Sequence, residues 1–392
     1  MSYKTMRRAG LLGLMLLLLV RAEVVFAQTT PPTLALTDRA LTPGQIAVGA
    51  EALLWRFKPS PTPVPLVTDG YIGEPNTRVL LGGGSVDTGA NPALRITAGY
   101  GLTSRSALEA NVFYIPPRST HAGIASTGKL GSSDLIIPFI DAFTNHESIS
   151  EISLAPIYKG SARVDFTNSL LGTEVNGVWA IAPAGSWQLD FIGGLRYLRL
   201  NEKYSFSTSS SYNPPFPPDI WLSTDRFETT NHFYGSQVGF RARLDHGAFF
   251  VAGTVKVAAG AVVQSVDISG SLVTNDFTSS GATVTYPGAY FALPTNIGRY
   301  SRTAFAVVPE AALNVGYRIT PAVTLVLGGS LLYANNVVRP GKQLSRTINS
   351  TQTTAYTENP TARLTGPALP TFQFNHSAFW TQGVSVGLTF RF

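Results

Sequence analysis

Residues 379–392 read FWTQGVSVGLTFRF, and the last apolar residues of this stretch stand at every second position: Val384, Val386, Leu388, Phe390 and Phe392. Successive side chains of an extended chain point to opposite faces, so these five share one face. The residues between them are Ser, Gly, Thr and Arg. This pattern predicts a β-strand with one apolar and one polar face. Soluble chains commonly end in polar, frayed residues, so the surface that this apolar face contacts must be identified.

The same period of two recurs along the chain. It predicts ten strands, at about 46–57, 93–102, 107–115, 170–181, 187–201, 232–244, 249–264, 303–317, 323–338 and 379–392. Residues 161–168, SARVDFTN, alternate as well. They either extend the fourth strand or form a separate hairpin, so twelve strands is the alternative count.

The connections between the predicted strands are of two sizes. Short turns occupy 103–106, 182–186, 245–248 and 318–322. Long segments rich in Pro, Gly, Ser, Thr and Asn occupy 58–92, 116–169, 202–231, 265–302 and 339–378. Loops of this length are unusual in compact soluble domains. Alternation of short and long connections is typical of outer-membrane barrels, with short periplasmic turns and long extracellular loops.

The N-terminus predicts export through the Sec pathway. Lys4, Arg7 and Arg8 precede AGLLGLMLLLLV at 9–20, an apolar run of about a dozen residues that is too short to span a bilayer. Cleavage is predicted after Ala27, with Ala22 as the alternative. Residues 1–27 are therefore predicted to be a signal peptide, residues 28–45 a periplasmic linker, and no later segment is apolar enough for a transmembrane helix.

Composition narrows the function classes. Charged residues make up 13% of the chain, against roughly 25% in soluble proteins. The net charge of +6 has no dense Lys/Arg run behind it outside the N-terminus, so no nucleic-acid partner is predicted. The chain has no cysteine, which excludes disulfides, Cys-ligated metals and a thiol nucleophile.

These observations together predict the fold class. A sheet in hydrocarbon has to close on itself, because lipid cannot hydrogen-bond an open edge. We therefore expect an all-β protein whose residues 46–392 form a closed antiparallel transmembrane β-barrel of about ten strands, in the outer membrane of a double-membraned bacterium. An even strand number places both termini on the periplasmic side, and outer-membrane lipid is the partner of the apolar faces.

The polar residues between the apolar ones are then predicted to face the barrel interior. The lumen-lining candidates are Arg95, Glu109, Glu174, Asp190, Arg196, Gln237, Arg241, Lys256, Glu310, Asn314 and Arg318, with Glu51 on the ambiguous first strand as the weakest. A ten-strand barrel is only slightly wider than an eight-strand barrel, which side chains nearly fill. The nearly balanced charges therefore favour a salt-bridged plug. A thin conductive path and a ligand site remain as alternatives.

The chain shows no pattern typical of an enzyme. None of its five histidines, at 121, 146, 232, 246 and 376, has a Ser or Asp partner that spacing would reveal. The glycine-rich residues 80–89 lack the Lys-Ser/Thr of a phosphate-binding loop. No catalytic residue, metal or cofactor is predicted. The aromatic residues near the strand ends fit interfacial girdles, and they are Trp55, Trp179, Trp187, Trp380, Tyr114, Tyr197 and Tyr333.

Several stretches resemble the β-barrel porin seven family of outer-membrane proteins. They are EALLWRFKPSPTPVPLVT (51–68), GEPNTRVLLGGG (73–84), GGLRYLRLNEKY (193–204), DRFETTNHFYGSQVGF (225–240), ALPTNIGRYSRTAFAVVPEAALNVGY (292–317), NNVVRPG (335–341) and FWTQGVSVGLTFRF (379–392). The resemblance implies an exported outer-membrane barrel, and the name of the family suggests a pore. The family brings no catalytic or ligand residues to assign to this chain. The last strand also resembles the signal read by the barrel-assembly machinery, carried here by Leu388, Phe390 and Phe392.

The leading functional hypothesis is a passive, monomeric, porin-like barrel with at most narrow conductance of small solutes. The alternative is a non-conducting structural or surface-interaction protein whose extracellular loops bind a cell-surface partner. Single-channel conductance separates the two, because only the first passes ions. The oligomeric state is not fixed by the sequence.

Overall fold

The computed structural model describes residues 34–36, 39–184, 186–216, 219–276, 281–357 and 365–392. The predicted signal peptide, residues 1–27, and both predicted cleavage positions lie outside these residues. In the predicted linker, β1 (Leu34–Leu36) pairs with β2 (Arg39–Leu41). No helix among the described residues is long and apolar enough to cross a membrane.

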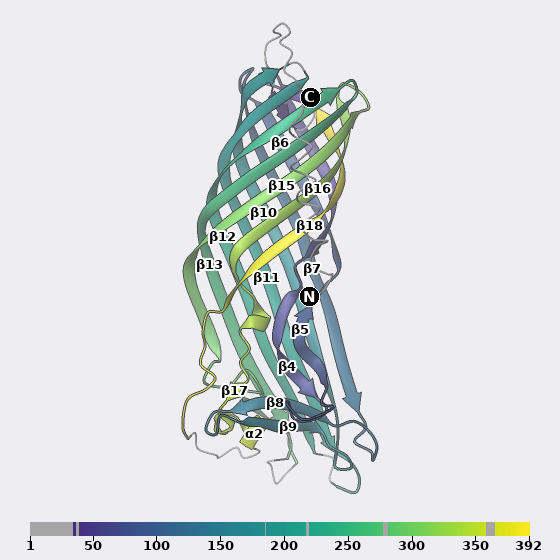
Figure 1. Cartoon of the computed structure of the whole chain (residues 1–392), viewed down its shortest axis with the longest axis vertical. Coiled ribbons are helices and arrows are strands. Elements are labelled where there is room, and N and C mark those ends of the chain that lie inside the picture. The colour runs from purple at the N-terminus through teal and green to yellow at the C-terminus, as the bar shows by residue number, and fades with distance from the viewer. Residues whose placement is uncertain (1–33, 37–38, 185, 217–218, 277–280, 358–364) are drawn as a thin grey trace.

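Within the described residues, ten strands form a ring of antiparallel neighbours (Figure 1). They are β3 (Ile46–Phe57), β6 (Ala90–Gly101), β7 (Ser106–Ser126), β10 (Tyr158–Ala184), β11 (Trp187–Tyr212), β12 (Ile220–His246), β13 (Phe249–Thr274), β15 (Gly298–Arg318), β16 (Val323–Val338) and β18 (His376–Arg391). The order around the ring is β12-β11-β10-β7-β6-β3-β18-β16-β15-β13, and β13 pairs again with β12. The C-terminal strand β18 pairs with β3, with Leu388 opposite Ala50, so the last strand of the chain closes the ring on the first.

The strand number agrees with ten rather than twelve. Residues 161–168 lie inside β10, so they extend the fourth strand of the ring instead of forming a hairpin. The other short strands lie outside the ring: β4 (Ser60–Thr68), β5 (Val79–Val86), β8 (Leu135–Asp141), β9 (Glu147–Ser153) and β17 (Thr347–Ile348) form a second sheet, here called the loop sheet. The short strand β14 (Val284–Pro287) pairs with β13.

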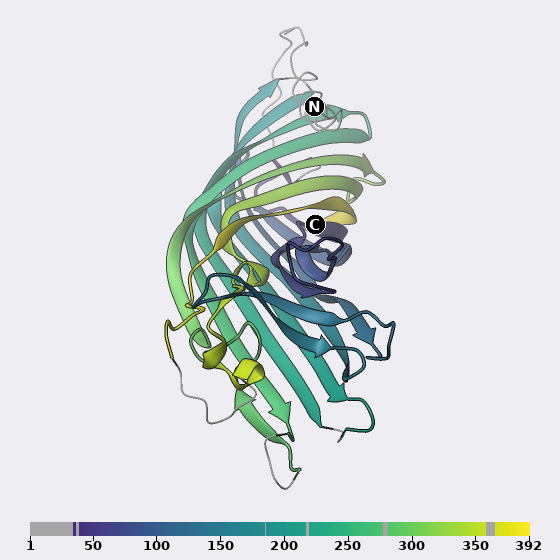
Figure 2. The same cartoon turned by 60° about the horizontal axis from the view of Figure 1, so that its bottom comes forward.

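The loop sheet lies at the end of the ring opposite the C-terminus (Figure 1). In Figure 2, which brings this end forward, its strands cross the ring instead of lengthening the wall. Three short helices follow β16 here: η1 (Pro340–Lys342), η2 (Ser350–Gln352) and α2 (Thr354–Thr357). The other end carries the short connections, such as residues 319–322 between β15 and β16. One end of the ring therefore carries much more of the chain than the other.

Much of the chain predicted as long loops is strand. β10 to β13 have 26 or 27 residues each, so residues 202–212 continue β11 and residues 220–231 begin β12. The prediction followed the Ser- and Thr-rich composition of these segments and overlooked the alternation that persists through them. Along β11, Tyr204 and Phe206 are buried while Lys203 is exposed. At about 3.3 Å per residue, β11 spans about 85 Å.

The outer face of the ring has two halves of different chemistry. On β11 the outward residues near the short connections are Trp187, Leu189, Phe191, Leu195 and Tyr197, and those beyond are Arg199, Asn201, Lys203, Ser205 and Ser207. On β13 the outward residues pass from Phe249, Val251, Val255 and Val257 to Ser265, Asp267 and Ser269. An apolar belt therefore surrounds only the half of the ring that carries the short connections.

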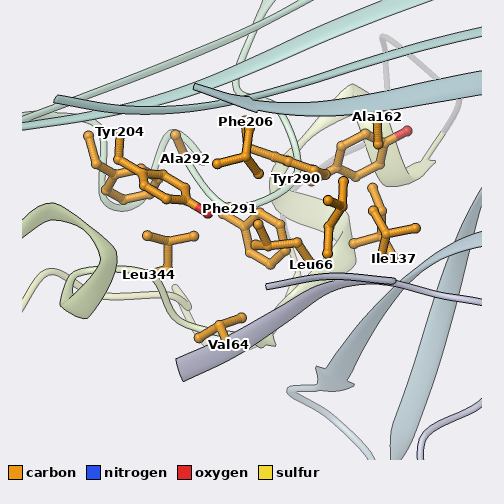
Figure 3. Close-up of a cluster of buried hydrophobic side chains, with 14 of the residues drawn as sticks. Val64, Leu66, Ile137, Ala162, Tyr204, Phe206, Tyr290, Phe291, Ala292 and Leu344 are labelled. Atoms are coloured by element: carbon orange, nitrogen blue, oxygen red, sulfur yellow. The ribbon is translucent and has the colours of Figure 1, made fainter. Parts of the chain in front are cut away.

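Packing between the loop sheet and the ring wall forms the largest apolar core. Figure 3 shows Phe291 between the wall residues Tyr204 and Phe206 and the loop-sheet residue Leu66. All four side chains are fully buried. Burial of aromatic residues of this size contributes strongly to stability. The loop sheet is therefore a packed part of the fold, which the sequence-based interpretation as loops missed.

Candidate functional site

The predicted lumen-lining residues all lie at inward strand positions. Seven of them are less than one tenth exposed: Glu109, Glu174, Asp190, Arg196, Gln237, Arg241 and Lys256. The other four, Arg95, Glu310, Asn314 and Arg318, are partly buried. Glu51 also faces inward, where the register of β3 places it opposite Arg95. These positions follow from the period of two, because every inward residue on a strand has the same parity.

Four charged residues form a cluster in the interior, here called the central charge cluster: Glu174, Arg196, Lys256 and Glu310. The Arg196 guanidinium donates to Glu174 Oε1 at 2.7 Å, and Lys256 Nζ donates to Glu174 Oε2 at 2.7 Å. Glu310 pairs with Arg196 and lies 3.3 Å from Lys256 Nζ. Two acids and two bases balance one another, so each buried charge has the partner it needs.

Two amides add hydrogen bonds to this cluster. Gln237 Nε2 donates to Glu174 Oε2 at 2.6 Å, and Asn176 Nδ2 donates to the same oxygen at 3.1 Å. The sequence analysis missed Asn176. It has the parity of Glu174 on the same strand, so a complete list of inward polar positions would have included it.

A second ion pair crosses the interior. Arg241 on β12 donates to both oxygens of Glu109 on β7, each at 2.8 Å. Strands β10 and β11 separate β7 from β12 in the ring, so this pair connects strands that are not neighbours. The fork of two parallel bonds fixes both side chains. The interior is therefore narrow enough at this level for side chains to bridge it.

Toward the short connections the polar contacts continue. Gln188 Nε2 donates to Asp190 at 2.7 Å, and Arg243 donates to Gln188 Oε1 at 2.7 Å. Asp245 accepts from Arg243 at 2.8 Å and also pairs with Arg318. The sequence analysis did not select Gln188, Arg243 and Asp245, although the first two lie two residues from predicted lumen residues.

Toward the loop sheet the interior becomes apolar. Leu53, Phe113, Leu170, Phe233 and other inward side chains pack together there. Leu170 and Phe233, with neighbours such as Leu198 and Phe379, line a cavity of about 20 Å³, close to the minimum that holds one water molecule. Trp55 belongs to this layer and is 2% exposed, so its predicted place in an outer aromatic girdle is wrong. The alternation of EALLWRF puts apolar residues on both faces and could not decide its direction.

Most of the other predicted girdle residues do face outward. Trp179, Trp187, Tyr114 and Tyr333 are 46%, 41%, 45% and 36% exposed. Trp380 and Tyr197 are partly buried. Along the last strand, Val384, Val386, Leu388, Phe390 and Phe392 are all exposed, and Thr389 and Arg391 are buried between them.

A fully buried ion pair joins the ring wall to the segment after β16. Arg339 donates to Glu202 at 2.9 Å, and both side chains have no exposed surface. Arg339 also donates to the backbone oxygens of Lys58 and Pro59 at 3.1 and 3.0 Å. Both members of the pair lay in predicted loops, so the sequence analysis missed the contact. The contacts of Arg339 therefore connect β11 with the residues that follow β3 and with the start of η1.

A buried carboxylate anchors the segment that precedes β15. Asp225 on β12 accepts the backbone N–H groups of Phe291 at 2.8 Å, Ala292 at 2.6 Å and Tyr290 at 3.3 Å. Its complete burial raises the pKa of the Asp225 carboxyl to about 7, against the effect of these three hydrogen bonds. The contact holds residues 290–292 against the inner wall.

The histidines and acidic residues do not gather into a metal site. Within the described ranges, no group of three or more His, Asp and Glu side chains is placed to hold an ion. His232 Nδ1 lies 2.8 Å from the Tyr197 hydroxyl on the outer face. His146 and Asp141 share a turn, where the His146 carbonyl accepts the Asp141 N–H.

These features define a class of protein: a ring of ten antiparallel strands with an apolar outer belt and a charged, filled interior is an outer-membrane β-barrel. A family model described as "Putative beta barrel porin-7 (BBP7)" matches residues 49–392, which include nearly the whole ring. The chain belongs to this family. The resemblance found in the sequence is thereby confirmed.

Comparison with curated protein sequences gives no significant match. Among solved structures, the chain is similar to the outer membrane protease OmpT from Escherichia coli, at 13% identity over 90% of this chain and 98% of that chain, with a TM-score of 0.45. A mutant of the monoaromatic hydrocarbon channel TodX matches at 6% identity over 90% and 91%, with a TM-score of 0.24. A Pseudomonas aeruginosa FadL homologue matches at 8% over 88% and 89%, with a TM-score of 0.20. No activity is transferred from similarities this low.

Proposed function

We propose that this outer-membrane barrel is passive and that its interior is a salt-bridged plug with at most narrow conductance. The central charge cluster carries this proposal. Its two acids and two bases neutralise one another across the interior, and the buried groups leave little room for water. A wide aqueous channel is typical of barrels with many more strands.

The apolar belt supports a defined placement in the membrane. A transmembrane β-strand needs about 9–11 residues, and the outward apolar run on β11 covers residues 187–197. We place the short connections and the C-terminus on the periplasmic side, and the loop sheet with the long strand extensions on the cell exterior. Outer-membrane lipid then surrounds the belt, and the barrel-assembly machinery would recognise the last strand. A single chain completes the ring, so the proposal requires no second copy.

The proposal includes no catalytic step and no cofactor. A second candidate function is a non-conducting protein that binds a cell-surface partner. It is favoured by the length of β10 to β13, since more than half of each strand would project beyond the membrane. In that case the extension and the loop sheet, rather than the interior, would carry the function.

Single-channel recording of the refolded chain in a planar bilayer tests the proposal. We expect small current steps, well below those of a wide porin. If ions pass, Lys256→Glu should change cation-over-anion selectivity, because Lys256 lies in the interior, while Lys203→Glu on the exposed outer face should not. Large, stable steps of porin size in the wild type would refute the plug. A complete absence of steps would favour the second candidate.

A further inference from the structure

A hollow of about 520 Å³ opens on the outer face of the ring over β10 to β13. Its outward lining residues are Thr173, Val175, Leu195, Tyr197, Tyr234, Ser236 and Ala259, and Glu174 and Arg196 of the wall also border it. The small side chains of Ser236 and Ala259 form its floor between larger apolar and aromatic neighbours. The volume is in the range of small-molecule sites. The hollow lies in the apolar belt, so a hydrocarbon chain is the ligand that its lining suits.

An arginine stands directly at the exterior end of this hollow. Arg199 follows Tyr197 by two residues on β11, about 7 Å along the strand. Its cross-strand neighbours are Leu171 and His232, and neither is acidic. Its Nε is buried and has no hydrogen-bond partner among the described residues. A buried donor on a cationic side chain is costly unless an acceptor binds it.

Other outward arginines of the extension have acidic partners. Arg163 pairs with Asp165 at 2.8 Å, Arg226 lies 3.9 Å from Glu228, and Arg299 lies 3.4 Å from Asp267. These residues are farther from the apolar belt than Arg199. The position at the belt edge is where the charged headgroups of a bilayer lie.

Aromatic side chains surround the proposed position of the ligand next to Arg199. The Tyr197 hydroxyl contacts His232 Nδ1 at 2.8 Å, which leaves His232 Nε2 as a further polar atom. The rings of Tyr197 and Tyr234 lie 5.1 Å apart, and His232 stacks on Tyr234. Amphipathic aromatic side chains of this kind are enriched at membrane interfaces. The polar atoms thus gather at the exterior end of the hollow and the apolar surface lies below them.

We propose that this hollow binds one anionic membrane lipid, with its phosphate on Arg199 and His232 and an acyl chain over Ser236 and Ala259. The inference rests on the proposed membrane placement, which puts Arg199 at the exterior headgroup level. Charge complementarity indicates the occupant. The Arg199 cation at the edge of the apolar belt would bind a phosphate, and the apolar floor of the hollow would contact a hydrocarbon chain. The lipid would bridge β11, β12 and β13 on the outside.

Native mass spectrometry of the refolded full chain tests the proposal, with dioleoyl phosphatidylglycerol and dioleoyl phosphatidylcholine as probes. We expect the wild type to retain one phosphatidylglycerol more tightly than phosphatidylcholine. Arg199→Gln should weaken phosphatidylglycerol binding about tenfold, the loss of one charge-assisted hydrogen bond. Ala259→Leu should fill the floor and weaken both lipids. Arg226→Gln is the matched control, since Arg226 lies about 20 Å farther along the wall, and it should change nothing.

Equal binding of the two lipids, or an Arg199→Gln variant with unchanged affinity, would overturn the lipid site. Equal loss in Arg226→Gln would do the same, because it would indicate unspecific charge attraction. Displacement of the lipid by inorganic phosphate alone would assign the site to a free anion and also overturn the proposal. Flotation with phosphatidylcholine vesicles separates the two proposals: a chain that inserts but shows no lipid preference refutes only the lipid site, and a chain that fails to insert refutes the membrane placement.

Discussion

Replacement of Glu174 by Gln tests whether the interior is a plug or a solvated path. Glu174 is 4% exposed. It accepts hydrogen bonds from Arg196, Lys256, Gln237 and Asn176 at 2.6–3.1 Å. The Gln side chain has nearly the same shape but no charge. It would leave two buried cations with Glu310 as the one acid of the central charge cluster.

The size of the effect follows from burial. Breaking one partner out of a buried ion pair costs about 3–5 kcal/mol, because the remaining charge is uncompensated. A pair in a water-filled path would be screened and would contribute below about 1 kcal/mol. We therefore expect Glu174→Gln to lower the free energy of unfolding by about 3–5 kcal/mol. Adding Lys256→Met should restore part of this loss, at least about 1 kcal/mol, since the remaining Arg196–Glu310 pair is neutral.

The assay is urea unfolding of the chain in phosphatidylcholine vesicles, followed by the fluorescence of its five tryptophans. Glu228→Gln is the matched control: Glu228 pairs with Lys203 at 2.8 Å on the outer face, and both side chains are nearly half exposed. This control should change stability by less than about 1 kcal/mol. If Glu174→Gln costs no more than the control, the cluster is solvated and the plug is refuted.

Three further predictions concern the extension, the belt and the last strand. In the folded chain the pKa of Asp225 is about 7, against 3.8 for an ordinary Asp. The contribution of this group to stability is therefore present at low pH and falls as the pH rises from about 4 to about 7. Asp225→Asn should flatten this part of the curve of stability against pH, and an unchanged curve would contradict the prediction. Leu195→Arg on the belt should cost about 2–4 kcal/mol in vesicles, whereas Ser205→Arg, on the same face farther out, should cost little; equal costs would contradict the belt boundary. Deletion of Phe392 should reduce the heat-modifiable, folded fraction in outer membranes. The control is Leu130→Ala, at an 84% exposed apolar residue between β7 and β8, which should change this fraction less; normal assembly of the deletion variant would count against an assembly signal.

The period of two predicted the strands of the ring, although the fold class also needed the N-terminal export signal and the unequal connections. It located all ten strands, because an inward and an outward face differ in chemistry wherever the wall separates lipid from a polar interior. It also placed Glu174, Arg196 and Lys256 on one side, although on three different strands. It could not show which of them would touch, since contacts across the ring depend on strand tilt and register rather than on sequence spacing. The Arg241–Glu109 pair shows this limit, because its members are 132 positions apart in the sequence.

The predicted strand boundaries were wrong where a Ser- and Thr-rich composition was taken as a sign of a loop although the residues still alternate. Residues 202–212 are rich in Ser and were assigned to a loop, yet Tyr204, Phe206 and Ser210 are buried at alternate positions. The loop sheet was missed for a different reason: β4 contains three prolines, which are rare within strands, so its strand character depends on packing against the wall. Local pattern cannot reveal a sheet whose burial comes from distant elements.

Alternate residues of β11 face inward and outward along its whole length, but the chemistry of the two faces differs between its two halves. Near the short connections, Leu195 faces out and Arg196 faces in; farther along, Lys203 faces out and Tyr204 faces in. The wall does not change, but the solvent outside it does. In hydrocarbon the outer side must be apolar, so charges collect inside. In water the outer side can be polar, and the interior then needs apolar residues to form a core. The reversal falls between residues 196 and 199, where the charges pass from the inward to the outward parity of the strand; in the proposed placement it would lie at the exterior edge of the membrane. Arg199 lies at that change, where its cation can contact headgroups and the hollow below it can contact chains.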